Sequence, residues 1–270
     1  YACLSHCWGG FVPLRTTKAT MEEFERGGIL WEDVLLTFKH AIEMTYQLGL
    51  RYLWIDSLYI VRDDMQDWRH EGSKKAEIYA GSYVTVAAMN APDSTAAFYL
   101  NGSRPYYRDW TIDFQQDDDS SKTYQISVHQ LSTESDFESL PLMQRAWFFQ
   151  ERLLTPRIVH FADDVLYWEC LEHTTDELGK ASTNILNSKS YLLGAVEREP
   201  PQSTHARPRL THSGNKSPDG ARKWHRIVEA YTCLNLTFSK DKLPALQGVA
   251  RSMQTERSGM YCAGLWEDTL

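Results

Sequence analysis

Residues 141–170 read PLMQRAWFFQERLLTPRIVHFADDVLYWEC, a sequence that predicts a short helix, a turn and then extended chain. Apolar side chains recur at helical spacing at Met143, Trp147 and Leu154. Pro156 ends this helix, because proline lacks the backbone N–H that the next turn needs. The apolar residues after Pro156 are typical of a strand. The stretch therefore predicts a helix-to-strand unit of an α/β fold.

Glu151 lies four residues after Trp147, so the two side chains project from the same face of this helix. An acid beside a flat aromatic ring is suited to binding or catalysis. An alternative is a solvated helix face on which Arg145, Glu151 and Arg152 form ion pairs, as most surface helices do. The segment alone favours the solvated face, and only the rest of the chain can distinguish it from a binding or catalytic role of Glu151.

Composition indicates an ordinary globular protein. The chain has 270 residues, enough for one large domain or two small ones, with 42% hydrophobic and 24% charged residues. Its net charge is −8, and it has no Lys/Arg run with interleaved aromatic residues. Both features argue against binding of nucleic acid by phosphate neutralisation. We therefore expect no nucleic-acid partner.

The cysteines indicate neither a disulfide framework nor a zinc site, because they are scattered and form no C-x-x-C pair. We expect buried, reduced thiols of a cytoplasmic protein at Cys3, Cys7, Cys170, Cys233 and Cys262. No apolar run approaches the ~20 residues that cross a bilayer, so we expect no membrane segment in this sequence. Because the chain does not begin with Met, we expect it to be a fragment of a longer protein.

Strand and helix patterns alternate through the first third of the chain. Residues 1–4 predict a strand that ends in the loop SHCWGG, and residues 31–48 have the apolar spacing of a helix. The run 51–56 predicts a buried strand with Asp56 at its end. A strand, a helix and a strand in this order form a βαβ unit with parallel strands. Ligands bind at the carboxyl ends of such strands, although His6 alone is more often a structural histidine.

A second helix and a third strand continue the pattern. Asp64 is a suitable N-cap, and the inward face carries Trp68 and Tyr79. We expect Glu71 and Lys75 to form an ion pair on the outer face. Residues rich in β-branched side chains then predict a strand. The expected parallel sheet contains residues 2–4, 53–55, 84–87 and 158–160.

The remaining segments add to this core, which we expect to span residues 1–170. Residues 92–140 interrupt it as an insertion, in which 110–114 and 124–128 predict a β-hairpin; the three Asp residues between these strands predict a solvated turn. Residues 171–220 predict a polar, partly mobile loop. Residues 221–270 predict a helical extension packed on the core, with helices at 221–231 and 243–252.

Several segments, in matching order, cover nearly the whole chain. They are LSHCWGG at 4–10, TFKHAIEMTYQLGLRYLWIDSLYI at 37–60, DDMQDWRHE at 63–71, IYAGSYVTVAA at 78–88, RAWFFQERLLTPRIVHF at 145–161, LPALQGVA at 243–250 and AGLWED at 263–268. Together they resemble the HET (heterokaryon incompatibility) domain of filamentous fungi. The family commonly has Cys, Gln, Met and Thr where this chain has Tyr59, Arg62, Ala76 and Phe148.

HET domains are thought to be distant relatives of TIR domains. The resemblance implies a TIR-like or flavodoxin-like, mainly parallel sheet flanked by helices, with the hairpin insertion and C-terminal helices added. Residues 1–5, 53–56 and 83–88 resemble the first three TIR strands. Trp147 and Glu151 have the W-x-x-x-E spacing around the glutamate that NAD-cleaving TIR domains use.

The resemblance also implies a chemistry and a set of site residues. Cleavage of the nicotinamide–ribose bond develops oxocarbenium character, which a carboxylate stabilises in a pocket shielded from water. Glu151 would be the catalytic carboxylate and Trp147 the shield. The ribose or phosphates would be bound by Ser5, His6, Trp8, Asp56 and Ser57. NAD would be the substrate, and neither a metal nor a cofactor would be required.

Three functions follow as alternatives. The first is a fungal non-self recognition domain that triggers programmed cell death, a form of innate immunity, through TIR-like NAD hydrolysis. The second is a non-catalytic module that signals by self-assembly with an attached or separate recognition domain. The third is a scaffold recruited as a cyclase or isomerase in small-molecule biosynthesis. A pocket rich in hydrogen-bond donors favours the first, a closed one the second, and a wide apolar one the third.

Overall fold

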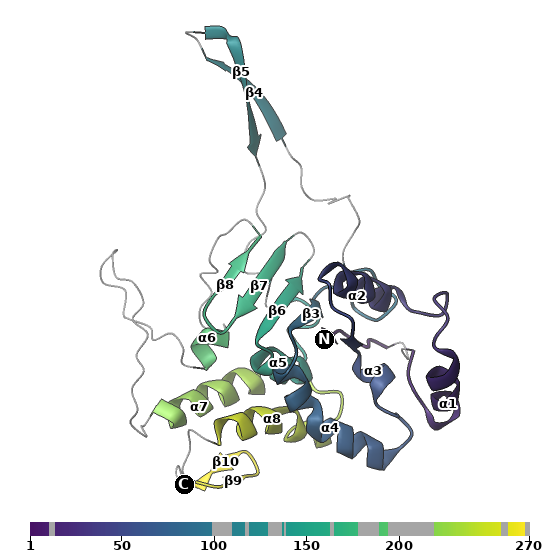
Figure 1. Ribbon diagram of the computed structural model, residues 1–270. Coiled ribbons are helices and arrows are strands. Elements are labelled where there is room, and N and C mark those ends of the chain that lie inside the picture. The colour runs from purple at the N-terminus through teal and green to yellow at the C-terminus, as the bar shows by residue number, and fades with distance from the viewer. Residues whose placement is uncertain are drawn as a thin grey trace.

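The computed structural model describes residues 1–10, 14–98, 110–116, 119–128, 137, 139–162, 165–177, 189–193, 219–254 and 259–267. Its centre is a six-stranded sheet with the order β2-β1-β3-β6-β7-β8 (Figure 1). The strands are β1 (Ala2–Ser5), β2 (Leu53–Trp54), β3 (Val84–Ala88), β6 (Arg157–Phe161), β7 (Leu166–Cys170) and β8 (Thr174–Asp176).

Four strands of this sheet, β2, β1, β3 and β6, run parallel, whereas β7 and β8 are antiparallel to their neighbours. The mainly parallel sheet expected from the sequence is confirmed. The four parallel strands follow the flavodoxin-like order. The extended chain after Pro156, predicted as one strand, contains two strands, β6 and β7, which pair antiparallel with each other.

Alternate residues of β1 face opposite sides of the sheet, as the two-residue period of a strand requires. Leu4 packs in one cluster with Phe38 of α2 (Leu36–Gln47). Cys3 packs on the other face with Tyr79 of α4 (Met65–Ala80). Phe148 of α5 (Ala146–Leu154) covers Ile158 of β6. Ser5 has the parity of Cys3 and therefore faces the side of the sheet that α4 and α5 cover.

The helix starts differ in how well the sequence predicted them. Asp64 caps α4, accepting hydrogen bonds from the backbone of Gln66 and Asp67, as predicted. The helix predicted at 31–48 begins only at Leu36, and Trp31, the first residue of the predicted range, lies outside it and is 53% exposed. The short helices α1 (Lys18–Gly27) and α3 (Asp56–Tyr59) were not predicted. No residue of α1 is buried, so the helix leaves no apolar stripe in the sequence.

The predicted hairpin is confirmed as β4 (Trp110–Gln116) paired antiparallel with β5 (Asp119–Val128), separate from the central sheet. The C-terminal helices are confirmed as α7 (Asp219–Thr232) and α8 (Pro244–Met253). Between them lies the 3-10 helix η3 (Ser239–Asp241), and after them the pair β9 (Tyr261–Cys262) and β10 (Leu265–Trp266).

The segment interpreted as a polar loop contains β8 and the short helix α6 (Lys189–Leu192). Lys189 and Leu192 are buried, which differs from an exposed loop. Only these two described side chains of α6 reach the core, too few to create a recognisable period in the sequence. The cysteines also differ from expectation, since Cys3 and Cys7 are buried but Cys233 and Cys262 are exposed.

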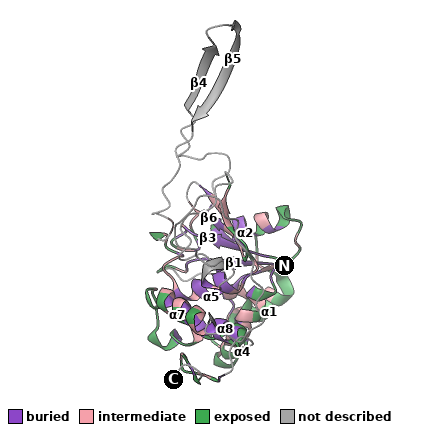
Figure 2. Cartoon of the chain, turned by 90° about the vertical axis from the view of Figure 1, so that its left-hand side faces the viewer, coloured by how far each residue is buried: buried purple, intermediate pink, exposed green. Residues whose placement is uncertain are grey.

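Helix α5 lies between the sheet and the C-terminal helices, so nearly all its residues are buried (Figure 2). Phe149 and Leu153 pack with Ile227 of α7 and Val249 of α8. On the sheet side, the Arg152 guanidinium donates to both carboxylate oxygens of Glu169, at 2.7 and 2.9 Å. Arg152 and Glu151 are both buried, so the solvated helix face is wrong. No helix among the described residues is long and apolar enough to span a membrane.

Helix α8 approaches α4 and α5 at Gly248, whose backbone N–H donates to Gln150 Oε1 at 2.7 Å. A Cβ atom at Gly248 would lie 2.5 Å from Ala76 Cβ and 2.6 Å from that oxygen. We predict that Gly248→Ala lowers the free energy of unfolding by about 1–3 kcal/mol, because α8 must move away. Urea unfolding measures this.

Gly72→Ala in α4 is the matched control, because no atom lies within 4 Å of the added methyl group. This change should be neutral or stabilising by up to about 1 kcal/mol through helix propensity. If Gly248→Ala were as stable as the original protein, the close packing of α8 would be contradicted.

Candidate functional site

A cavity of about 590 Å³ opens beyond the carboxyl ends of β1 and β2, on the side of α4 and α5. Segments far apart in the sequence line it: the loops after β1 and β2, the helices α4 and α5, and residues 237–241. Its basic residues are Arg15, Arg62, Lys75, Arg145 and Lys240, and its acidic residues are Asp56, Glu151 and Asp241. The cavity is also lined by the aromatic side chains of Trp8, Trp68, Tyr79, Trp147, Phe148 and Phe238.

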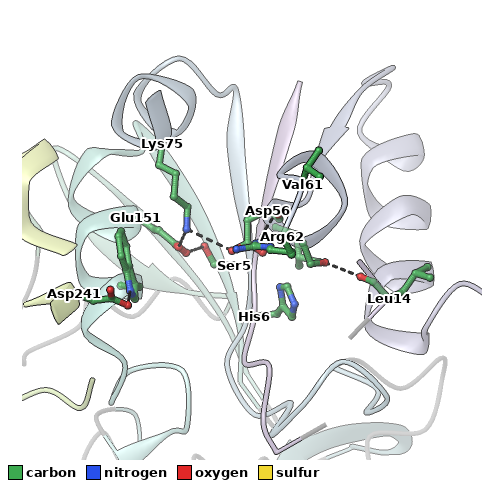
Figure 3. A network of polar contacts seen from close by, with 12 residues as sticks. Ser5, His6, Leu14, Asp56, Val61, Arg62, Lys75, Glu151 and Asp241 are labelled. Atoms are coloured by element: carbon green, nitrogen blue, oxygen red, sulfur yellow. Dashed lines mark hydrogen bonds and ion pairs between the residues drawn. The ribbon is translucent and has the colours of Figure 1, made fainter. Parts of the chain in front are cut away.

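Glu151 lines the cavity and is buried, with 7% of its surface exposed. Its Oε2 atom accepts a hydrogen bond from Ser5 Oγ at 2.6 Å (Figure 3). Its Oε1 atom lies 3.4 Å from the ammonium group of Lys75. Ser5 at the end of β1 and Lys75 of α4 therefore fix the position of the Glu151 carboxylate on α5.

Lys75 connects this carboxylate to a second one. Its Nζ atom lies 3.4 Å from Asp56 Oδ2 as well as from Glu151, and 4.9 Å from the centre of the Trp147 ring. The predicted outer pair of Glu71 and Lys75 is wrong, because Glu71 pairs with Lys74 at 2.9 Å. Lys75 lies four residues before Tyr79, on the inward face, and this spacing is the signal that sequence reasoning missed.

Asp56 begins α3 directly after β2 and meets a second cation. Arg62 Nη2 lies 3.2 Å from Asp56 Oδ2, and the guanidinium group sits 4.3 Å from the centre of the Trp8 ring. Burial raises the pKa of Asp56, but Lys75 and Arg62 outweigh this effect, so the pKa lies below its ordinary value. Asp56 is therefore ionised, and its Oδ1 atom has no hydrogen-bond partner among the residues that the structure describes.

His6 follows β1 and is buried, with its ring edge-on to Phe38 at a centroid distance of 5.2 Å. Burial lowers the pKa of His6 to about 4, although Asp56 opposes this shift. The imidazole is therefore neutral at pH 7, and within the described part of the chain its Nε2 atom has no hydrogen-bond partner. Arg145 donates a hydrogen bond to the backbone carbonyl of His6.

The structure brings together most of the residues that the sequence proposed. The cavity is lined by His6, Trp8, Asp56, Trp147 and Glu151. Ser5 does not line it but donates a hydrogen bond to Glu151. Ser57 does not join them, because it is fully buried and its Oγ donates to the backbone carbonyl of Leu14 at 3.0 Å. Sequence reasoning did not propose Lys75, Arg62, Arg145 or Asp241 as site residues.

The cavity has five basic and three acidic residues, in a chain whose net charge is −8. Local positive charge with aromatic walls suits an anionic ligand that also carries flat rings. Within the described part of the chain, no group of three or more His, Cys, Asp or Glu residues could hold a metal ion. The basic residues of the cavity can bind an anion, and a carboxylate in the position of Glu151 can stabilise positive charge that develops beside it.

Comparison with known protein families identifies a match over the first part of the chain. The family model described as Heterokaryon incompatibility protein (HET) matches residues 1–151, more than half of the chain. No curated protein and no solved structure matches the chain. The matched range includes the loops after β1 and β2, α4 and Glu151 itself, but it ends before residues 237–241.

We predict that His6 makes stability depend on pH. Its pKa is about 4 in the folded protein and ordinarily 6.5, so the unfolded chain binds the proton more readily between these values. The free energy of unfolding therefore decreases as the pH falls below 6.5. Protonation of His6 accounts for about 2 kcal/mol of this decrease at pH 5. In His6→Gln, the difference in unfolding free energy between pH 7.5 and pH 5 should shrink by that amount.

Urea unfolding at the two pH values provides the measurement. His160, which is also buried, is unchanged in both proteins, so its contribution cancels. An unchanged pH dependence in His6→Gln would show that His6 is not held neutral by burial.

Proposed function

The chain belongs to the heterokaryon incompatibility family, and on this premise we propose that it hydrolyses NAD to trigger programmed cell death after non-self recognition. The family assignment supports a role in fungal heterokaryon incompatibility. The observation that carries the enzymatic part is the geometry of Glu151. A buried carboxylate faces a cavity of ligand size and is held by Ser5 and Lys75. We further propose that the domain acts in the cytoplasm with an attached or separate recognition domain.

The reaction has simple requirements. The C–N bond between the ribose and nicotinamide breaks, nicotinamide leaves with the electron pair, and positive charge develops on the ribose. Water then adds to the ribose carbon and loses a proton, which gives ADP-ribose. Glu151 would stabilise the positive charge at the ribose, in a site where low solvent exposure strengthens the interaction. Ser5 and Lys75 keep the carboxylate in place without movement during the reaction.

The rest of the cavity fits the remaining parts of the substrate. NAD has a negatively charged diphosphate, for which Arg15, Arg62 and Arg145 provide cationic partners. Its two flat ring systems can stack on aromatic walls such as Trp8 and Trp147. Five basic residues are a poor lining for the apolar substrate of a cyclase or isomerase, so the charge of the cavity disfavours that alternative.

A non-catalytic signalling module is the second candidate, and the pairing of Glu151 favours it. The Glu151 carboxylate connects α5 to β1 through Ser5 and to α4 through Lys75, so its contacts stabilise the fold whether or not it takes part in catalysis. In this case the domain would signal by self-assembly, and Glu151 would matter for folding alone. The two candidates differ in whether nicotinamide is released.

Glu151→Gln separates the candidates. The amide keeps the size of the side chain and can still accept a hydrogen bond from Lys75, but it lacks the negative charge. We predict that nicotinamide release from NAD falls by about 100-fold or more. The assay uses purified protein at concentrations high enough for assembly, and the melting temperature is measured for each variant. Killing of fungal cells expressing each variant is scored in parallel.

Glu77→Gln, on the exposed side of α4, is the matched control and should retain full activity. A folded Glu151→Gln protein with unchanged nicotinamide release would exclude Glu151 as the catalytic carboxylate. If the original protein kills cells but releases no nicotinamide in its assembled form, the signalling module is the correct function.

A further inference from the structure

One wall of the cavity comes from outside the part of the chain that matches the family. Thr237, Phe238, Lys240 and Asp241 line the cavity, whereas the family match ends at residue 151. These residues precede α8, whose packing against α4 and α5 holds the segment beside the site. The family-matched segment alone therefore does not complete the cavity.

Asp241 is the acidic residue of this wall, and several contacts fix its position. It ends η3, and its backbone N–H donates to the Phe238 carbonyl at 3.0 Å. The next residue is also anchored, because the Tyr231 hydroxyl donates to the Lys242 carbonyl at 2.7 Å. The Asp241 side chain accepts a hydrogen bond through Oδ2 from Trp147 Nε1 at 3.3 Å. It lies in the same polar cluster as Glu151 and Lys75 in Figure 3.

The second oxygen of Asp241 makes no such contact. Oδ1 is buried, in a residue that is only 8% exposed, and none of the described residues forms a hydrogen bond with it. Asp56 and Glu151 each pair with a cation, but no described cation forms an ion pair with Asp241. A buried carboxylate oxygen is costly when it is unpaired, and an ionised carboxylate can only accept hydrogen bonds. The oxygen is thus suited to a ligand group that donates hydrogen bonds.

We propose that Asp241 binds the hydroxyl groups of the ribose whose bond to nicotinamide is broken. This inference rests on the proposed function and names a specificity residue for it. Trp147 links the two acids, because it contacts Asp241 directly and lies one helical turn before Glu151. A ribose carbon beside Glu151 would place its neighbouring hydroxyls toward Asp241. Hydrogen bonds to the 2-hydroxyl strengthen in oxocarbenium-like transition states, so this contact would also support the reaction.

Asp241→Asn tests the proposal with little structural change. The amide oxygen can still accept the Trp147 N–H, which leaves the NH₂ group toward the cavity and replaces an acceptor with a donor. The probes are ADP-ribose and ADP, which differ in the terminal ribose. The original protein should bind ADP-ribose more tightly than ADP. Asp241→Asn should bind ADP as tightly as the original protein does, but its preference for ADP-ribose over ADP should fall by about tenfold or more. Calorimetry measures both affinities.

Asp64→Asn is the matched control, since asparagine also caps helices and Asp64 lies outside the cavity. An unchanged preference for ADP-ribose in Asp241→Asn would overturn the proposal, as would an original protein that binds ADP-ribose no better than ADP. NAD hydrolysis is measured in a separate assay, so failure of the proposed function can be distinguished from failure of the role of Asp241. If the ribose preference depends on Asp241 but NAD is not cleaved, the hydrolase fails and the binding site stands. If NAD is cleaved and the preference survives the substitution, only the role of Asp241 fails.

Discussion

The ammonium group of Lys75 lies between the carboxylates of Asp56 and Glu151, and the rest of the site depends on this arrangement. It joins the end of β2, α4 and α5 within a region of low solvent exposure. Without this cation the two carboxylates would repel each other, and the buried charge of Glu151 would be left uncompensated, which is strongly destabilising. The same contact thus holds the elements together and fixes the Glu151 carboxylate beside the cavity, so fold and proposed chemistry share one interaction.

Local patterns in the sequence predicted the sheet and much of the site. Apolar runs bounded by helices predicted the parallel strands, and the strand pattern placed Asp56 at the carboxyl end of one of them, where ligands bind in parallel sheets. Helical spacing placed Trp147 and Glu151 on one face. These inferences succeeded because they depend on the period of a helix or strand and on the geometry of parallel sheets, which change little with tertiary context.

The failures concern residues whose surroundings are set by tertiary contacts. Lys75 has the spacing of a surface ion pair with Glu71, yet two carboxylates from other elements bind it in the interior. Ser57 follows Asp56 directly, but the helical turn of α3 directs its hydroxyl to the Leu14 carbonyl instead. Asp241 lies far along the chain from Trp147, so no local pattern indicated their contact. In each case the partner, not the neighbouring sequence, determines the role of the residue.

A double-mutant cycle between Lys75 and Glu151 tests the central interaction most directly. The free energy of unfolding is measured by urea for Lys75→Met, Glu151→Gln and the double variant. Because Lys75→Met leaves Glu151 buried without its cation, neutralising Glu151 should recover part of the loss, with a coupling energy of about 1–3 kcal/mol. Additive effects of the two substitutions would contradict the account, since they would show that this ion pair does not hold the site together.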